Sequence, residues 1–195
     1  MEIIGNGFLG TSLQPLVDSH DGATLFVSGV SSAGETAELA FAREGEYLHE
    51  TLQQCRQHGS LLVYFSTTTV SMHAFETSDD RAGREDGPVY PAGLYGRHKL
   101  SMEAVITTSG ADYLILRLAT PVGPLQRAHQ FLPSIVRQVQ LGDVQVFHGA
   151  RRDLVYVDDV MTIVDGLLRA GVRREIVNVA SGVAVPVEDI ITYLE

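Results

Sequence analysis

Cysteine is almost absent from this sequence of 195 residues, because Cys55 is the only one. A single thiol cannot close an internal disulfide, and it cannot build the cysteine cluster of a structural metal site. We therefore expect no metal. Cys55 falls on the apolar stripe of an expected helix, which indicates a buried thiol with a structural role.

Positive charge is also scarce. Lysine and arginine total 14 against 24 aspartate and glutamate residues, which gives a formal net charge of −10. A nucleic-acid-binding surface needs basic side chains, so this balance argues against a nucleic acid partner. No apolar run reaches the length that spans a bilayer, and the chain enters a glycine motif at residue 5 without a signal-peptide pattern. We expect a cytoplasmic protein with no membrane partner.

Apolar strands and helices alternate along most of the chain. Strands are expected at 1–4, 24–30, 61–65, 113–118 and 176–179, and helices at 8–17, 35–58, 95–109 and 160–170. This order predicts an α/β fold in which crossover helices join parallel strands. The later part is less regular, with a helix expected at 131–141, a strand at 144–147, a last helix at 187–194, and N-caps at Asp158 and Asp159.

The run GNGFLG at residues 5–10 follows the first expected strand and fits the pattern G-x-G-x-x-G. Glycines let such a turn approach a pyrophosphate closely, and the N–H groups at the start of the next helix can bind it. The cofactor-binding candidates in this run are Gly5, Gly7, Phe8, Leu9 and Gly10. A plain glycine-rich turn between a strand and a helix is the alternative that the motif alone leaves open.

Tyr95 and Lys99 lie four residues apart at the start of an expected helix, so both side chains lie on one face of it. An ammonium beside a phenol favours the phenolate, and we expect the pKa of Tyr95 to fall. Tyr95 is thus a candidate general acid or base. Thr67 and Thr68 follow the strand expected at 61–65, at the sheet edge where ligands of open α/β folds bind. The alternatives without a function are that Tyr95 and Lys99 form a solvent-exposed pair and that the threonines are a run that favours β-structure.

Six segments, in this order, resemble the extended short-chain dehydrogenase/reductase superfamily and, within it, the NAD-dependent epimerase/dehydratase family that acts on nucleotide sugars. The resemblance covers nearly the whole chain. It implies a Rossmann-like doubly wound parallel sheet with a small substrate-binding portion, divided as 1–125 and 126–195 and packed as one compact unit. The six segments are GNGFLG at 5–10, FSTTTV at 65–70, YGRHK at 95–99, LRLATPVGP at 116–124, RRDLVYVDDV at 151–160 and NVASG at 178–182.

The resemblance also implies roles for particular residues. Tyr95 is the acid or base, Lys99 holds the nicotinamide ribose, and Thr67 orients the substrate oxygen. The glycine run and Ser31 hold NAD or NADP, with the choice between the two left open. The substrate-binding candidates are Thr68, Thr120 and Arg152, for the last of which an ion pair with a neighbouring aspartate is the alternative. Relatives pair the helices that match 35–58 and 95–109, so we expect a homodimer.

The chain also departs from the family pattern. A strand, helix and strand that normally form the adenosine pocket are missing between residues 17 and 24, which shortens the sheet and leaves strand 1–4 near an edge. Thr68 and Thr69 replace the acidic pair of dehydratases, which disfavours dehydration. Two hypotheses follow: an NAD(P)-dependent nucleotide-sugar epimerase or 4-keto reductase, and a non-catalytic relative that binds a nucleotide sugar or a partner protein.

Overall fold

The computed structural model describes residues 1–32, 34–71, 81–91 and 93–195, and its larger layer is a parallel sheet of five strands. Every pair of neighbouring strands in it runs parallel, as the alternation of strands and helices predicts. The strands, in spatial order, are β1 (Glu2–Ile4), β2 (Ala23–Phe26), β3 (Leu61–Thr67), β4 (Tyr113–Leu118) and β7 (Glu175–Val179).

β1 forms one edge of this sheet, because β2 is its only neighbour in the part of the chain that the structure describes. The expected shortening is therefore confirmed: the chain passes from β1 to β2 through a short helix α1 (Phe8–Ser12) and a 3-10 turn η1 (Gln14–Leu16), without the strands that would extend the sheet. Pro15 in η1 fits the early end of α1, since proline lacks the N–H that a continuing helix needs.

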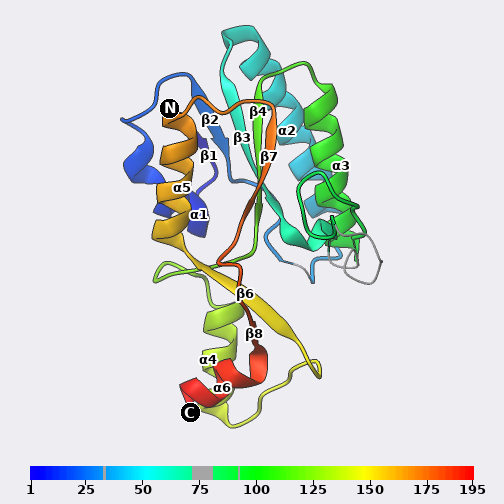
Figure 1. Cartoon of the computed structure of the whole chain (residues 1–195), viewed down its shortest axis with the longest axis vertical. Helices are drawn as coiled ribbons and strands as arrows, with labels where there is room; N and C mark the ends of the chain where they lie inside the picture. Colours follow the sequence, from blue (N-terminus) through cyan, green and yellow to red (C-terminus); the bar gives the residue numbers. More distant parts are fainter. Residues whose placement is uncertain (33, 72–80, 92) are drawn as a thin grey trace.

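Helices cover both faces of the larger sheet (Figure 1). On one face lie α1 and α5 (Val157–Arg169), and on the other α2 (Glu38–His58) and α3 (Leu94–Thr108). Alternate residues of β3 enter the two cores: Val63 packs on the α1 and α5 side, and Leu62 and Tyr64 pack on the α2 and α3 side. This confirms the doubly wound fold. Cys55 is buried in the second core, as expected.

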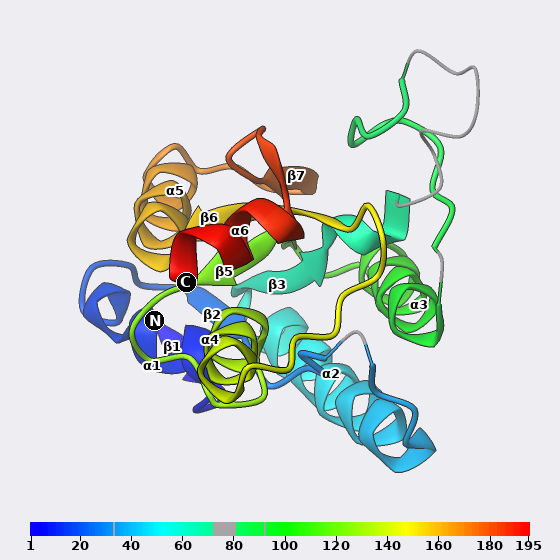
Figure 2. The same ribbon diagram turned by 90° about the horizontal axis from the view of Figure 1, so that it is seen from below.

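A second, smaller sheet has the order β5–β6–β8 and lies in the lower part of Figure 1. β5 (Thr120–Val122) pairs parallel with β6 (Arg151–Tyr156), which pairs antiparallel with β8 (Ala184–Pro186). Two helices, α4 (Phe131–Leu141) and α6 (Val187–Leu194), lie together beside it (Figure 2). Residues 126–195 contribute to both layers, because α5 and β7 return to the larger sheet.

Four details of the expected pattern are wrong. Residues 144–147 form no strand, and the expected loop after β4 contains β5. The strand at 24–30 ends at Phe26, so Ser31 follows a loop and not a strand. The N-cap of α5 is Tyr156, which places Asp158 and Asp159 inside the first turn, where their charges favour the positive end of the helix dipole.

Candidate active site

Thr67 and Tyr95 lie together at the carboxyl end of β3. Thr67 is the last residue of that strand, and Tyr95 is in the first turn of α3. The Thr67 hydroxyl hydrogen-bonds with Tyr95, and it also donates to the Thr69 hydroxyl at 2.9 Å. A phenol and a strand-end hydroxyl thus meet at the edge of the sheet where open α/β folds bind ligands.

The phenol of Tyr95 is harder to ionise than we expected. Burial raises its pKa to about 12, the negative charge of Glu44 adds to that effect, and only the hydrogen bond with Thr67 opposes it. The expectation that Lys99 lowers the pKa of Tyr95 is therefore wrong. Burial of the phenol is the main cause of the raised pKa, and the Glu44 carboxylate contributes a negative charge to the same site.

Lys99 is buried and makes three interactions. Its Nζ donates to Glu44 Oε1 at 2.8 Å and to the Tyr64 hydroxyl at 3.1 Å. A third, longer contact of 3.4 Å reaches the backbone oxygen of Phe65. Complete burial lowers the pKa of the Lys99 ammonium, and the Glu44 carboxylate partly offsets that effect. Lys99 is therefore the counter-ion of a buried carboxylate.

Glu44 accepts hydrogen bonds at both carboxylate oxygens. Oε1 accepts from Lys99 and, at 2.6 Å, from the Tyr64 hydroxyl. Oε2 accepts from the Val30 backbone N–H at 2.7 Å and contacts His98 Nε2 at 3.0 Å. Burial alone would raise the pKa of Glu44, but the bond with His98, the charge and bond of Lys99 and the bond with Tyr64 outweigh it and lower the pKa from 4.5 to about 2.

This lowered pKa makes the fold sensitive to acid. Glu44 binds its proton less readily in the folded protein than in the unfolded chain, so its contribution to stability is complete above pH 4.5 and is lost as the pH falls toward 2. The shift corresponds to about 3 kcal/mol. We expect the free energy of unfolding, measured with urea, to decrease over this range by that amount more in the wild type than in Glu44→Gln. Equal pH dependence in the two proteins would contradict the shift.

A second buried ion pair lies under the same face of the sheet. The Arg117 guanidinium donates through Nη2 to Glu103 Oε2 at 2.7 Å and through Nε to both oxygens, and the Ser66 hydroxyl donates to Glu103 Oε1 at 2.5 Å. Arg117 also contacts the backbone oxygen of Glu85, whose carboxylate accepts from the Asn178 N–H. The described residues of the polar segment before α3, 81–91, are thereby attached to β4 and β7. Residues 72–80 and 92 lie outside the described residues.

The glycine turn has the shape that a close backbone approach requires. Gly5 has φ +120°, which favours glycine, and a Cβ there would lie 2.8 Å from backbone atoms of Val27 and Ser28. A Cβ at Gly10 would overlap the backbone oxygen of Gly5. By contrast, a Cβ at Gly7 would meet nothing within 4 Å. The turn is thus tightly packed inside and open at Gly7, as a backbone that receives a ligand must be.

The other cofactor-binding candidates, Phe8, Leu9 and Ser31, have different surroundings in the structure. Phe8 is buried, and its ring lies against Gly123, while Leu9 packs against the core under α1. For both residues only the backbone N–H is left to face a ligand. Ser31 is exposed in the loop after β2. These assignments to cofactor binding stay predictions.

Among the substrate-binding candidates, Arg152 has the most informative surroundings. No described carboxylate pairs with it; its guanidinium lies 5.3 Å from the centre of the Phe131 ring, and it donates to the backbone oxygen of Arg151. The neighbouring Asp153 instead accepts hydrogen bonds from Ser181 and Gly182. Among the described residues, Arg152 therefore does not form the ion pair with a neighbouring aspartate that was the alternative. Thr68 and Thr120 are half-buried, in the turn after β3 and at the start of β5.

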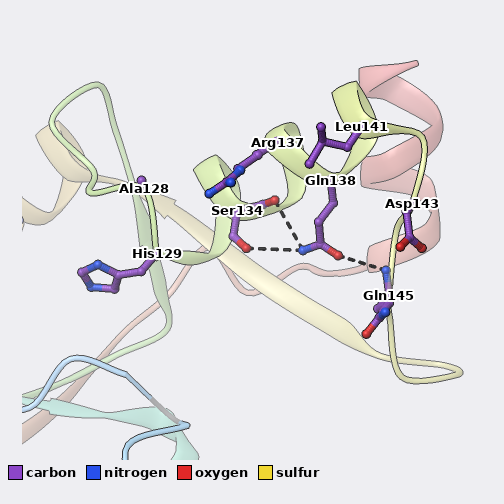
Figure 3. A pocket seen from close by; sticks show the side chains of 8 residues that line it. All are labelled: Ala128, His129, Ser134, Arg137, Gln138, Leu141, Asp143 and Gln145. Atoms are coloured by element: carbon purple, nitrogen blue, oxygen red, sulfur yellow. Dashed lines mark hydrogen bonds between the residues drawn. The ribbon is translucent and has the colours of Figure 1, made fainter.

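A separate open pocket of about 580 Å³ lies along α4 and the loop that follows it (Figure 3). Gln138 holds the loop to the helix: its amide donates to Ser134, and its oxygen accepts from the Gln145 N–H at 2.9 Å. His129 and Arg137 add basic groups to the lining. None of the predicted site residues lines this pocket, so it is distinct from the cluster around Tyr95.

Sequence reasoning missed the residues that control this cluster, namely Glu44, Tyr64 and His98. One signal was available for Glu44. It occupies the apolar stripe of α2, three residues after Phe41 and four before Leu48, and a carboxylate at such a position needs a buried partner.

Among the described residues, no cluster of histidine, cysteine and acidic side chains has the composition of a metal site. No described helix is long and apolar enough to cross a membrane.

Known proteins share this fold. RMD from Pseudomonas aeruginosa, solved in complex with NADPH, superposes with a TM-score of 0.77 at 21% identity over 97% of this chain and 80% of that chain. The Bordetella bronchiseptica enzyme WbmG, solved in complex with NAD and UDP, superposes with a TM-score of 0.73 at 18% identity over 98% of this chain and 61% of that chain.

A curated relative is similar in sequence over part of its length. The low-salt glycan biosynthesis protein Agl12 of Haloferax volcanii is 27% identical over 106 residues, which make up 51% of this chain and 34% of Agl12. The chain therefore spans only about a third of this relative. The model of the NAD dependent epimerase/dehydratase family, by contrast, matches residues 6–180, from the glycine turn to the loop after β7. With its sheet order, its glycine turn and this match in agreement, the chain belongs to the NAD dependent epimerase/dehydratase family.

Proposed function

We propose that the protein is an NAD(P)-dependent nucleotide-sugar 4-keto reductase or epimerase. The observation that carries this proposal is the meeting of the Tyr95 phenol with the Thr67 hydroxyl at the carboxyl end of β3. A proton donor beside a second hydroxyl can hold a substrate oxygen between them. Thr68 and Thr69, in the turn after β3, offer no carboxylic acid to expel a hydroxyl, which disfavours dehydration.

The state of Tyr95 favours the reductive direction. With a pKa of about 12 the phenol keeps its proton at neutral pH, so it acts as a general acid toward a carbonyl oxygen. Thr67 would position that oxygen, and a reduced nicotinamide cofactor, when bound, would supply the hydride that goes with the proton of Tyr95. Abstraction of a proton from a substrate hydroxyl would first need the phenolate, which burial and the charge of Glu44 oppose.

The residues present suit one end of a dinucleotide better than the other. Gly5 and Gly10 are required by close packing, and Gly7 opens toward free space where a pyrophosphate could lie against the backbone. The N–H groups of Phe8 and Leu9 would face the phosphates, and Ser31 would lie beside them. At the adenosine end, β1 has no further strand beside it, which leaves the choice between NAD and NADP open.

The substrate would span the two layers. Arg152 has no described carboxylate partner, so its guanidinium is available for a diphosphate, which its planar fork suits. Thr68 and Thr120 would bind the sugar. The basic and polar pocket along α4 belongs to residues 126–195, the region that we assign to substrate binding. UDP in the WbmG complex supports a nucleotide-linked substrate.

A non-catalytic role is the second candidate, and a specific observation favours it. Lys99 already has Glu44, Tyr64 and Phe65 as partners, and no strand among the described residues extends the sheet beyond β1. Calorimetric titration with NADH and NADPH separates the candidates. Binding of either nucleotide supports the enzyme. Saturable binding of a UDP-sugar without binding of either nicotinamide cofactor at millimolar concentration favours the non-catalytic relative.

We also expect the protein to form a homodimer through α2 and α3. The two helices pack side by side on one face of the sheet, and apolar side chains on them remain exposed, among them Leu39, Tyr47 and Val105. Light scattering at micromolar concentration should give twice the mass of 21.2 kDa. Val105→Glu, on the exposed surface of α3, should shift the protein toward the monomer, whereas Thr107→Glu, which is exposed but polar, is the matched control. A monomeric wild type would contradict the expectation.

A further inference from the structure

Lys99 is the only lysine of the chain, and each of its N–H donors has an acceptor within the protein. An ammonium has three N–H donors, and Nζ has three acceptors: Glu44 at 2.8 Å, the Tyr64 hydroxyl at 3.1 Å and the Phe65 backbone oxygen at 3.4 Å. The ammonium also lies 4.9 Å from the centre of the Tyr64 ring. No donor of Lys99 is left over for a ribose hydroxyl.

The backbone of the loop after β2 closes over this ion pair. A Cβ added at Gly29 would lie 2.5 Å from Glu44 Oε1 and 2.6 Å from Lys99 Nζ, so a larger residue there must displace the ends of these two side chains. The next residue, Val30, donates its N–H to Glu44 Oε2 at 2.7 Å. The same carboxylate therefore holds both the loop and the lysine, and access to Lys99 requires that at least one of these contacts be broken.

Glu44 is the centre of this arrangement because all four of its hydrogen-bonding positions point to different partners. Lys99 balances its charge at 2.8 Å, and His98 contacts it at 3.0 Å; the His98 ring lies tilted against Phe41, with the ring centres 4.7 Å apart. Other charges on this face lie on Glu103 and Arg117, which satisfy each other. Removal of the Glu44 charge would leave Lys99 as a buried cation without a counter-ion, which strongly favours its movement toward solvent or an anionic ligand.

We propose that Glu44 is a positioning residue that withholds Lys99 from the nicotinamide cofactor, so that Lys99 contacts the cofactor only when the Glu44 contact is released. This inference rests on the proposed function for its cofactor part, whereas the hold of Glu44 on Lys99 stands on the geometry alone. The affinity for NADH or NADPH is thereby set by a residue that does not itself touch the cofactor.

The single lysine allows a direct test. We would measure by intact and peptide mass spectrometry how fast an amine-reactive ester labels Lys99, with the Met1 amine as the internal reference. We expect Glu44→Gln to raise the labelling rate at least tenfold and to tighten the binding of NADH or NADPH, measured by calorimetry, by roughly tenfold, with the added nucleotide protecting Lys99 from the label. Glu44→Asp keeps the charge and should restore slow labelling.

Two further variants separate the charge from general loosening of the core. Tyr64→Phe removes one partner of Lys99 and of Glu44 but keeps the ion pair, so we expect slow labelling and wild-type affinity. Gly29→Ala keeps every charge and pushes a methyl group against the pair, so we expect faster labelling. Gly29→Ala also provides the test if Glu44→Gln does not fold, as judged by circular dichroism.

The outcomes distinguish the two ideas. Slow labelling in a folded Glu44→Gln or in Gly29→Ala overturns the hold of Glu44 on Lys99. Fast labelling together with unchanged or weaker cofactor affinity overturns the control of the cofactor site. Binding of neither NADH nor NADPH by any of the proteins overturns the proposed function, while fast labelling in the same experiment still supports the hold of Glu44 on Lys99.

Discussion

Replacement of Tyr95 by phenylalanine is expected to abolish most turnover while leaving cofactor binding intact. The substitution removes the phenolic proton and keeps the ring. A positioned general acid contributes about 10²–10⁴-fold to the rate, so we expect a loss of that size in kcat. The structure places the Tyr95 phenol beside the Thr67 hydroxyl. The rate should be measured as NADH or NADPH oxidation with a 4-keto nucleotide sugar.

Tyr193→Phe is the matched control, because its side chain is 90% exposed at the end of α6 and the same atom is removed. The pH profile adds a second readout: with the pKa of Tyr95 near 12, the reductive rate of the wild type should stay level through neutral pH and show no loss that reports ionisation of this phenol. Turnover by Tyr95→Phe equal to that of the wild type would remove Tyr95 from the mechanism and leave Thr67 without its proposed partner.

The larger sheet could be predicted from sequence because its central strands, β2, β3 and β4, are buried on both faces. β3 begins with five apolar residues and β4 is apolar except at Arg117. α2 ends at Gly59, which has the left-handed conformation that glycine favours at a helix end. These signals are local. They are sufficient to predict five parallel strands and their helices. The missing strand between residues 17 and 23 could be predicted in the same way, because that stretch is short and has no apolar run.

The smaller sheet could not be predicted in this way. β5 and β8 have three residues each, and β6 is only partly buried, so none of them has a strong apolar pattern. What makes them strands is pairing between distant segments: Thr120 lies opposite Leu154, and Arg152 opposite Val185. The polar run at 151–153 forms part of a strand because β6 pairs with β5 and with β8, and the sequence does not show which distant segments will pair.

The sequence led to Tyr95, Lys99 and Thr67 as candidate site residues, but it did not predict the effect of their surroundings on the pKa of Tyr95. The spacing of Tyr95 and Lys99 places both on one face of α3, and the resemblance adds Thr67, which the structure brings next to Tyr95. The predicted direction of the Tyr95 pKa was wrong because burial of the phenol raises the pKa, and because Glu44, 55 residues before Lys99, adds a negative charge and pairs with the ammonium. Helical spacing reports neighbours on one helix and carries no information about a carboxylate on the helix packed beside it.

Arg117→Met is expected to cause a large loss of stability, because it breaks a buried ion pair. Arg117 and Glu103 are each only 3% exposed, and Arg117 supplies the only cation paired with this carboxylate among the described residues. Its removal leaves a buried charge with one hydroxyl partner, Ser66, and breaking a buried pair in this way costs about 3–5 kcal/mol. Because whole domains are stable by only about 5–15 kcal/mol, urea unfolding should show the midpoint fall steeply.

A double substitution separates the charge from the packing in this prediction. Arg117→Met combined with Glu103→Leu removes both charges, and an apolar pair of similar volume is often as stable as a buried ion pair, so the double variant should recover most of the lost stability. Arg169→Met removes an arginine from an exposed pair with Asp165 and should leave the urea midpoint almost unchanged. If the double variant is as unstable as Arg117→Met, the loss comes from packing of the arginine stem and its contact with Glu85, and the buried charge is not the cause.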